Sequence, residues 1–532
     1  MTIKADYDVA IVGYGPVGAV LAALLAKRGR RVAVIETQSE IFDKPRAIAA
    51  DHEALRIFQW CGLGDVLPGM IGRHPGTDFL GVDGKIIRKY DPQPPPFPLD
   101  WLPTGTFVQP ELEAKLRAAV ERSPQVRVFK PCEAVGIDQD GEAVTLSLRG
   151  TDGRPATVTA RYLAGCDGAG SFVRKQLALP LEDLAFDEWW IVVDTLLHRD
   201  VTLPERCVQY CWPSRPATFI IGPRNVRRWE IKLLPGERPE DFGDPKSILE
   251  CLARFVDVSA LEIWRAAVYR FHALVAARWR QGRAFIVGDA AHQMPPFLGQ
   301  GLCSGLRDAA NLAWKLDLAL RHDGADRVLD SYELERKPHI RELVEVTKSF
   351  GLVIGELDAD KARRRDAELR EQLERGTAIT VRQRYIPPLK AGLIDTDVEG
   401  RPTRGAGTLF VQPRLRMPGG ETARLDDVVG DEFLLATHTD AAQSWLDEEA
   451  AALLRRIGAA RVVIASNGAV PTTPAPDGVV RLVEAHGLFA AWAGEQACEA
   501  VLVRPDRYVC GVASDATGLN RLIKSLGRQL FR

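Results

Sequence analysis

A glycine-rich turn between two short apolar segments constrains the fold of this chain more than any other feature. The run YDVAIVG at 7–13 has the length and the β-branched content of a buried parallel strand. Gly13, Gly15 and Gly18 form a GxGxxG pattern there, an Ala/Leu-rich helix follows, and a second strand ends at Glu36. Such a strand–helix–strand unit is right-handed almost without exception. The sequence therefore predicts a Rossmann-like sheet at its N-terminus.

The same turn predicts a dinucleotide site. Its glycines permit a tight turn and let the backbone approach a pyrophosphate, whose charge the start of the helix favours. Glu36 lies 18 residues after Gly18, where a carboxylate accepts hydrogen bonds from ribose hydroxyls. The pattern alone does not distinguish FAD from NAD, so a plain NAD-dependent dehydrogenase stays open at this point.

Composition excludes several other classes of protein. The chain has 532 residues, and single cores stop growing at roughly 250–300 residues, so we expect two or three domains. The 69 basic and 71 acidic residues leave a net charge of −2, which argues against a nucleic-acid partner. No apolar run approaches the roughly 20 residues of a membrane span, and the first residues lack the pattern of a signal peptide. The nine cysteines are scattered without CxxC or a Cys/His cluster, which indicates reduced thiols, a cytoplasmic location and no metal site.

The pattern of elements along the chain predicts an α/β fold with three functional parts. Residues 1–185 and 279–390 carry the nucleotide-binding strands and helices, the second part adding several long helices. Residues 186–278 alternate short strands with Gly/Pro turns, which predicts an inserted antiparallel sheet that binds the substrate. Residues 391–532 read as a linker followed by a small, separate α/β domain.

Two later segments decide between the dinucleotides. They are YLAGCDGAGSFVR at 162–174 and GDAAHQMPPFLGQG at 288–301. Together with the N-terminal turn they resemble, in order, spacing and residue identity, the three fingerprints of FAD-dependent aromatic hydroxylases, the single-component flavoprotein monooxygenases. The resemblance implies FAD as cofactor, NADH or NADPH as co-substrate, O2, and a phenolic substrate. A plain dehydrogenase would leave the segment 288–301 unexplained.

The family's FAD contacts can be carried over residue by residue. Asp289 follows a predicted strand, where its carboxylate can accept a hydrogen bond from a ribityl hydroxyl. A helix is expected to begin near Gly299, and its free N–H groups would face the pyrimidine edge of the flavin. Besides the glycines and Glu36, the residues expected to contact FAD are Arg46, Gln109, Asp167, Asp289, Pro296, Gly299, Gln300, Gly301 and Leu302.

Several stretches resemble one branch of the family more closely. PRAIAADHEALRIFQWCGL at 45–63, RRWEIKLLPGE at 227–237 and the segment 288–316 are similar to 3-(3-hydroxyphenyl)propionate hydroxylases, which also act on 3-hydroxycinnamate. The resemblance continues loosely into the C-terminal domain, which is thioredoxin-like in related phenol hydroxylases. Because CxxC is absent, a structural or oligomerisation role is favoured there. A homodimer is common in this family.

The resemblance also implies a reaction in aromatic catabolism. Reduced FAD reacts with O2 to a C4a-hydroperoxide, and one oxygen atom is transferred to the ring carbon ortho to the phenol hydroxyl. The product from 3-(3-hydroxyphenyl)propionate would be 3-(2,3-dihydroxyphenyl)propionate. Hydroxylases of another phenol or of a polyketide would show the same fingerprints, and a non-catalytic flavin-binding scaffold is a further alternative.

The residues that meet the substrate are harder to predict. Tyr210 lies in the expected substrate sheet and is a candidate to handle the phenol proton. His292, within GDAAH, could do so too, although support of the flavin loop is the favoured interpretation. Arg215 and Arg224 are candidates to bind a substrate carboxylate.

Overall fold

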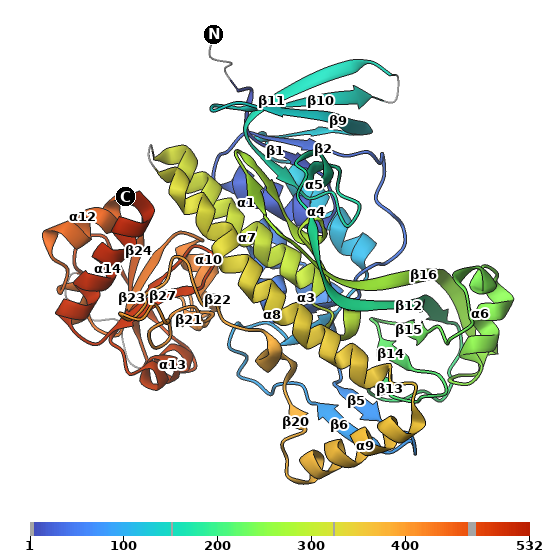
Figure 1. Ribbon diagram of the computed structural model, residues 1–532. Helices are drawn as coiled ribbons and strands as arrows, with labels where there is room; N and C mark the ends of the chain where they lie inside the picture. The colour runs from blue at the N-terminus through green and yellow to red at the C-terminus, as the bar shows by residue number, and fades with distance from the viewer. Residues whose placement is uncertain (1–4, 151–152, 323–324, 467–474, 532) are drawn as a thin grey trace.

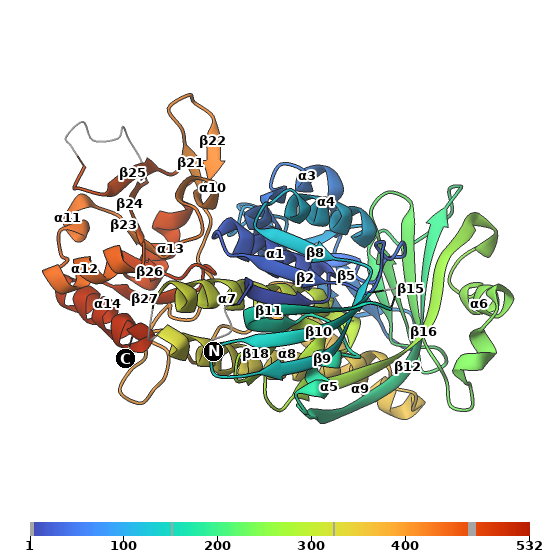
Figure 2. The ribbon, with the colours of Figure 1, turned by 90° about the horizontal axis from the view of Figure 1, so that it is seen from above.

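The computed structural model describes residues 5–150, 153–322, 325–466 and 475–531. Three parts lie in a row (Figures 1 and 2): a large, mostly antiparallel sheet at one end, an α/β domain with the glycine-rich turn in the middle and a C-terminal α/β domain at the other end. Two long helices, α7 (Gly301–Arg321) and α8 (Asp330–Ile354), cross the middle part and reach toward both neighbours.

The middle part is built on the predicted parallel sheet. Strand β1 pairs in parallel with β2 and β11, β2 pairs in parallel with β8, and β11 pairs in parallel with β18. The parallel strands are β1 (Tyr7–Val12), β2 (Val32–Ile35), β8 (Val126–Phe129), β11 (Pro155–Gly165) and β18 (Ala284–Ile286). Antiparallel strands extend this sheet, namely β9 (Cys132–Gln139), β10 (Val144–Gly150) and β17 (Arg280–Gln281).

Apolar side chains of the helices cover this sheet. Helix α1 (Pro16–Lys27) packs against α7 and against α4 (Gln109–Glu121), and nearly all of α7 is buried because it lies between the sheet and the C-terminal domain. Shorter elements complete the middle part: β3 (Ala49–Asp51), α2 (His52–Phe58), η1 (Gln59–Leu63), α3 (Leu67–Met70), β4 (Gly72–Arg73), β7 (Thr104–Thr106) and α5 (Phe172–Gln176).

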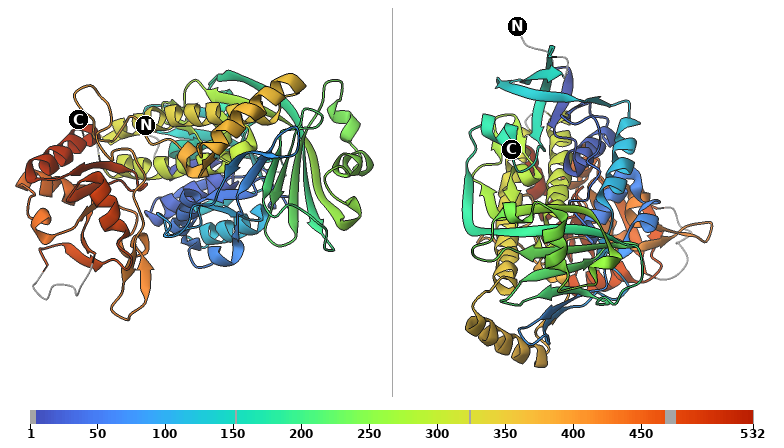
Figure 3. Two further views of the ribbon diagram at one scale, coloured as in Figure 1. Left: turned by 90° about the horizontal axis from the view of Figure 1, so that it is seen from below. Right: turned by 90° about the vertical axis from the view of Figure 1, so that its right-hand side faces the viewer.

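The large sheet has nine strands in the order β19-β16-β12-β15-β14-β13-β5-β6-β20, and one of its faces is turned toward the viewer in the right panel of Figure 3. The strands predicted within 186–278 form its middle: β12 (Leu181–Leu197), β13 (Cys207–Tyr210), β14 (Ala217–Ile221), β15 (Val226–Lys232) and β16 (Leu261–Ala276). Helix α6 (Pro245–Leu252) covers its outer face.

This sheet also draws on segments outside 186–278. They are β5 (Thr77–Leu80), β6 (Ile86–Tyr90), β19 (His292–Gln293) and β20 (Ile379–Thr380). The densely charged helix α9 (Ala359–Glu374) packs beside β6. These added strands are short, and the pairs that join them to the sheet (β5 with β13, β6 with β20) link segments far apart in the sequence, so local periodicity does not reveal them.

The C-terminal domain has a five-stranded sheet in the order β25-β24-β23-β26-β27, in which β23, β24 and β25 are parallel and β26 and β27 are antiparallel. Its strands are β23 (Leu434–Thr437), β24 (Ala460–Ala465), β25 (Val479–Val483), β26 (Ala500–Val503) and β27 (Val509–Ala513). A hairpin and five helices surround them: β21 (Arg414–Arg416), β22 (Thr422–Arg424), α10 (Leu425–Val429), α11 (Asp440–Gln443), α12 (Glu448–Arg456), α13 (Leu488–Gln496) and α14 (Ala516–Phe531).

The thioredoxin-like assignment of this domain stays a prediction. All nine cysteines of the chain are free thiols, including the buried Cys498 and Cys510. Among the described residues, no helix combines the length and the apolarity needed to cross a membrane.

Candidate active site

A cavity of about 430 Å³ lies where the middle part meets the large sheet. The start of α1 and the loop at 287–302 form one side of it, and strands of the sheet form the other. Apolar side chains line much of its wall, among them Ile48, Ile220, Phe271 and Phe297. One space is therefore shared by the predicted cofactor-binding turn and the predicted substrate sheet.

The three glycines of the N-terminal turn have different roles. Gly13 has φ +99°, and a Cβ there would lie 2.4 Å from the carbonyl oxygen of Cys166. A Cβ on Gly18 would lie 2.1 Å from the carbonyl oxygen of Gly13. Gly15 lines the cavity instead, and a Cβ there would meet nothing within 4 Å. Gly13 and Gly18 thus close the turn, whereas Gly15 leaves a cradle for a ligand in front of the uncapped start of α1.

Glu36 ties the end of β2 to this turn. Its Oε2 accepts a hydrogen bond from the backbone N–H of Tyr14 at 2.8 Å, and its Oε1 accepts one from that of Gln38 at 2.8 Å. The carboxylate is therefore fixed beside the cradle, and its contact with a ribose stays a prediction.

On the same side of the cavity, the loop at 287–302 contains most of the other residues predicted to bind FAD. Asp289, in the short turn η4 (Gly288–Ala290), is exposed to the cavity and has no hydrogen-bond partner among the described residues. Surrounding protein raises the pKa of its carboxyl by desolvation. The remaining cavity-lining members of this set are Arg46, Gln109, Pro296, Gly299, Gly301 and Leu302. Pro296 begins η5 (Pro296–Leu298), and α7 begins without a side-chain cap, so its first N–H groups are free for a ligand.

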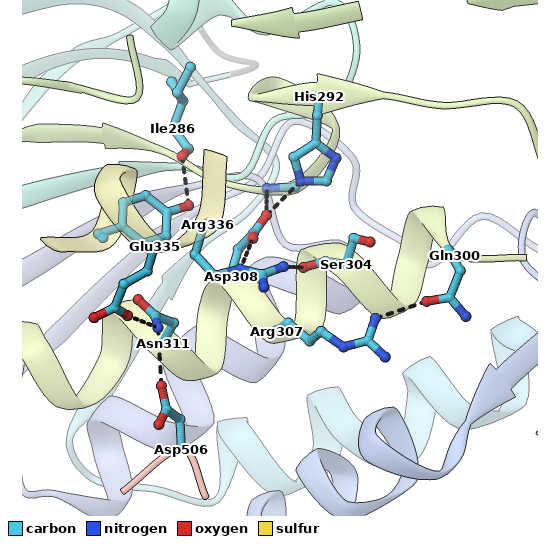
Figure 4. Close-up of polar contacts among 12 residues, drawn as sticks. Ile286, His292, Gln300, Ser304, Arg307, Asp308, Asn311, Glu335, Arg336 and Asp506 are labelled. Atoms are coloured by element: carbon cyan, nitrogen blue, oxygen red, sulfur yellow. Dashed lines mark hydrogen bonds and ion pairs between the residues drawn. The ribbon is translucent and has the colours of Figure 1, made fainter. Parts of the chain in front are cut away.

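A buried carboxylate holds this loop from behind (Figure 4). Asp308 of α7 accepts hydrogen bonds from the backbone N–H of Gly288 at 3.2 Å and from Nε of Arg336 at 2.8 Å, and its Oδ2 lies 2.7 Å from Nε2 of His292. Burial alone would raise the pKa of Asp308, but His292 and Arg336 lower it below its ordinary value. His292 is buried, stacks on Trp279 and does not line the cavity, which is the position of a residue that supports the loop.

The side chains of Gln300 and Asp167 are turned away from the cavity. Gln300 donates to Asp51 at 3.1 Å and accepts from Arg307 at 2.9 Å, as part of a buried polar network. Asp167 accepts hydrogen bonds from Ser171 Oγ at 2.5 Å and from a backbone N–H at the start of α5. Neither residue is part of the cavity wall, and both side chains are already bound within the protein.

The structure does not bring the predicted substrate residues to the cavity. Successive side chains of a strand point to opposite faces, so Gln209 faces the cavity while Tyr210 packs on the outer face against Phe255. Arg215 forms an ion pair with Glu237 through both of its terminal nitrogens. Arg224 is exposed and pairs with Glu111 on the surface.

Glu230 of β15 is a cavity residue that the sequence analysis did not single out. It lies on one cross-strand row with Thr218 and Gln209, all three lining the cavity. Its side chain is buried without a hydrogen-bond partner among the described residues. Burial raises the pKa of its carboxyl to about 7, an effect that Arg228 partly offsets. The sequence carries a signal for it, because Arg228 and Glu230 alternate with apolar residues in a strand.

His74 and Arg382, at the far edge of the sheet, were also missed. His74 Nδ1 accepts a hydrogen bond from the backbone N–H of Gly76 at 3.1 Å, and burial lowers the pKa of the imidazole to about 3. Arg382, in η7 (Arg382–Tyr385), donates to the carbonyl oxygen of Leu298. Both side chains line the cavity, and no local sequence pattern brings these segments together.

Comparisons with known proteins agree with this site. Residues 6–347 match the FAD binding domain family, and residues 407–529 match the HcaD C-terminal domain family. A protein of Klebsiella pneumoniae named 3-(3-hydroxy-phenyl)propionate/3-hydroxycinnamic acid hydroxylase is 33% identical over 96% of this chain and 92% of its own length. The chain belongs to the FAD-dependent aromatic hydroxylases. The predicted family and its FAD cofactor are thereby confirmed, and the open cradle at Gly15 fits the pyrophosphate of that cofactor.

Further relatives place this hydroxylase among enzymes with different substrates. A probable NADH-specific resorcinol 4-hydroxylase of Rhodococcus jostii is 34% identical over 98% of this chain and 94% of that protein. Among solved structures, the flavin-dependent monooxygenase PieE has a TM-score of 0.77 at 22% identity, with 99% of this chain and 100% of that chain covered. The anhydrotetracycline hydroxylase OxyS from Streptomyces rimosus has a TM-score of 0.76 at 22% identity, with 99% of both chains covered. These structures confirm the predicted α/β fold over the whole chain.

Proposed function

We propose that this FAD-dependent hydroxylase uses NADH or NADPH and O2 to hydroxylate 3-(3-hydroxyphenyl)propionate ortho to its phenol hydroxyl. The products are 3-(2,3-dihydroxyphenyl)propionate, water and the oxidised nicotinamide. The observation that carries the proposal is the single cavity that joins the cofactor cradle to the inner face of the large sheet. The name of the Klebsiella relative supports the substrate, and the name of the Rhodococcus relative supports a nicotinamide as reductant.

The cradle residues would hold FAD along one side of the cavity. The free N–H groups at the start of α1 would bind the pyrophosphate, with Glu36 on the ribose and Asp289 on a ribityl hydroxyl. The start of α7 would stabilise negative charge on the reduced ring. When bound, FAD supplies electron transfer from the nicotinamide and the activation of O2. We assign the contacts at Asp167 and Gln300 to backbone atoms.

The other side of the cavity would hold the phenol. Glu230, with a pKa of about 7, can accept the proton of the phenol hydroxyl near neutral pH, which makes the ring a better nucleophile. Phe271 and Phe297 supply apolar surface that packs on the ring and excludes water. We therefore propose Glu230, in place of Tyr210 or His292, as the group that handles the phenol proton.

Aerobic turnover by the FAD-loaded protein tests this function. NADH and NADPH oxidation would be followed with and without 3-(3-hydroxyphenyl)propionate, while product mass and hydrogen peroxide are measured together. We expect faster oxidation and a product heavier by one oxygen atom. Faster oxidation that yields only peroxide, or no stimulation by the compound, would contradict the proposed substrate.

A neutral phenol is the second candidate substrate, because the Rhodococcus relative is equally similar to this chain. Resorcinol in the same assay distinguishes the two. A cytoplasmic location and a homodimer belong to this proposal as well, and light scattering during size-exclusion chromatography tests the homodimer.

A further inference from the structure

Four arginine side chains line the cavity in the part of the chain that the structure describes. Two of them already have carboxylate partners. Arg228 binds both oxygens of Asp194, at 2.7 and 3.0 Å, and Arg270 binds both oxygens of Asp187. These two guanidinium groups are therefore not available to a further anion without loss of an existing ion pair.

The remaining two arginines lie in different places. Arg46 is exposed, lies 5.3 Å from the ring centroid of Phe42 and belongs to the predicted FAD contacts. Arg382 follows β20 after one residue, and Thr380 of β20 pairs with Tyr90 of β6 at the edge of the large sheet. The backbone of the edge strand thus fixes Arg382 at the substrate side of the cavity.

The guanidinium group of Arg382 has few hydrogen-bond and ion-pair partners in the cavity wall. It donates to the carbonyl oxygen of Leu298, and no carboxylate among the described residues forms an ion pair with it. A Cβ built on Gly299 would lie 2.7 Å from Nη2 of Arg382, so the guanidinium reaches to the loop just before α7. The other N–H groups of Arg382 remain for a ligand in the cavity.

The groups around Arg382 do not neutralise it. Burial and the charge of Arg382 keep His74 neutral, with a pKa of about 3, and burial raises the pKa of the Cys207 thiol to about 11. Asp51, the carboxylate whose charge acts on Arg382, is already bound to Arg307 and Gln300. A cation that is desolvated without a partner is costly, so this site favours a ligand that brings a negative charge.

We propose that Arg382 binds the carboxylate of the aromatic substrate and so determines the preference for phenols with an acidic tail over neutral phenols. The planar guanidinium presents paired N–H groups that match the two oxygens of a carboxylate. This inference rests on the proposed function and replaces Arg215 and Arg224, which the structure pairs with Glu237 and Glu111.

Binding of two matched ligands to the FAD-loaded protein tests the inference without turnover. 3-(3-Hydroxyphenyl)propionate carries the carboxylate, and 3-propylphenol has a methyl group in its place. Calorimetry would measure both dissociation constants for the wild type, Arg382→Met and Arg382→Lys. Arg384→Met is the control, because Arg384 is exposed in the same short helix and lies outside the cavity wall.

We expect Arg382→Met to weaken binding of the acid about 30- to 100-fold, the loss expected for a charged hydrogen-bonded pair. Binding of 3-propylphenol and the FAD content should change less than about threefold, and Arg382→Lys should restore part of the affinity for the acid. Arg384→Met should bind both ligands as the wild type does.

Other outcomes separate this inference from the proposed function. Equal effects of Arg382→Met on both ligands, or no effect on the acid, would overturn the carboxylate site even if the wild type hydroxylates the acid. If Arg382→Met weakens only the binding of the acid, the carboxylate site is supported even if the wild type converts neither compound. Failure of the wild type to convert either compound would contradict only the proposed function.

Discussion

Glu230 is a carboxyl group whose protonation the surrounding protein controls. It is buried on the cavity face of the sheet, and burial raises its pKa from an ordinary value of 4.5 to about 7. The folded protein therefore binds this proton more tightly than the unfolded chain does. The stability that this proton contributes is fully present below pH 4.5 and is lost as the pH rises through about 7.

Glu230→Gln should remove this pH dependence. Relative to the variant, the wild type should lose up to about 3 kcal/mol of unfolding free energy between pH 4.5 and pH 7. The hydroxylation rate of the wild type should rise with a step near pH 7 that the variant lacks, because an amide cannot accept the phenol proton. Thermal unfolding and turnover between pH 5 and pH 8.5 measure both effects.

The control for this experiment is Glu240→Gln, which changes an exposed side chain next to the same sheet. It should reproduce the wild-type pH profiles. A Glu230→Gln protein with an unchanged step near pH 7 would show that another group handles the proton.

The residues of the cofactor side could be predicted from the sequence, and those of the substrate side could not. Gly15 and Asp289 lie in contiguous motifs whose spacing fixes their local geometry, and both line the cavity. The roles of Tyr210 and Gln209 depend instead on which face of a strand points inward, which the short strand β13 does not reveal. Arg382 reaches the cavity because β20 pairs with β6, a strand far away in the sequence, with Ile379 opposite Lys89.

At the scale of elements, the two glycines at the start of α1 have different roles: Gly18 is required by the fold, and Gly15 leaves room for the cofactor. Gly15 has φ −67°, which any residue adopts, and its Cβ position is open. Gly18 lies against the carbonyl of Gly13, where a Cβ has no room. Two neighbouring glycines in one motif should therefore respond differently to the same substitution.

Gly15→Ala should leave the stability of the FAD-free protein within about 0.5 kcal/mol of the wild type, because the new methyl group enters open space. It should lower the affinity for FAD at least tenfold, because that space is where the pyrophosphate would bind. Gly18→Ala is the matched comparison and should destabilise the FAD-free protein by about 2 kcal/mol or more. Flavin fluorescence titration and thermal unfolding distinguish the two, and equal FAD affinity of Gly15→Ala and the wild type would contradict the cradle.

Strands β1, β2 and β18 of the parallel core were predictable at this scale because each contains a short, buried apolar run. The large sheet was predictable only in its middle. Strands β5, β6 and β20 are 4, 5 and 2 residues long, and only their pairing with distant strands shows that they belong to this sheet. The large sheet therefore includes segments of the chain that lie outside residues 186–278.

At the scale of the whole molecule, the C-terminal domain lies beside the middle part (Figure 2), and buried ion pairs join the two. Asp426 of the C-terminal domain binds Arg56 of α2 and Arg507 within a fully buried cluster. Glu335 of α8 binds Lys315 of α7 and Arg504 of the C-terminal domain. Because α7 also begins at the cavity, the C-terminal domain supports the helix that forms part of the site.

Low pH should weaken the buried ion pairs between the C-terminal domain and the middle part. Burial alone would raise the pKa of Glu335, but Arg504 and Lys315 lower it to about 2 from an ordinary value of 4.5. A lowered pKa contributes stability that is present above pH 4.5 and is lost as the pH falls toward 2. Glu335→Gln leaves the buried Lys315 without its carboxylate and removes one of the two carboxylates bound to Arg504, which keeps Asp506, so it should cost about 3–5 kcal/mol at pH 7. That cost should shrink steadily as the pH is lowered from 4.5.

Calorimetric unfolding of the FAD-loaded wild type and Glu335→Gln at pH 7, 5 and 3.5 measures this difference. Glu342→Gln on the same helix is the control, because Glu342 pairs with Lys390 on the surface, where such pairs contribute about 1 kcal/mol or less. A variant that unfolds in two transitions at pH 7, where the wild type unfolds in one, would show that Glu335 couples the C-terminal domain to the rest. An effect of Glu335→Gln no larger than that of Glu342→Gln would instead mean that apolar packing alone holds the domains together.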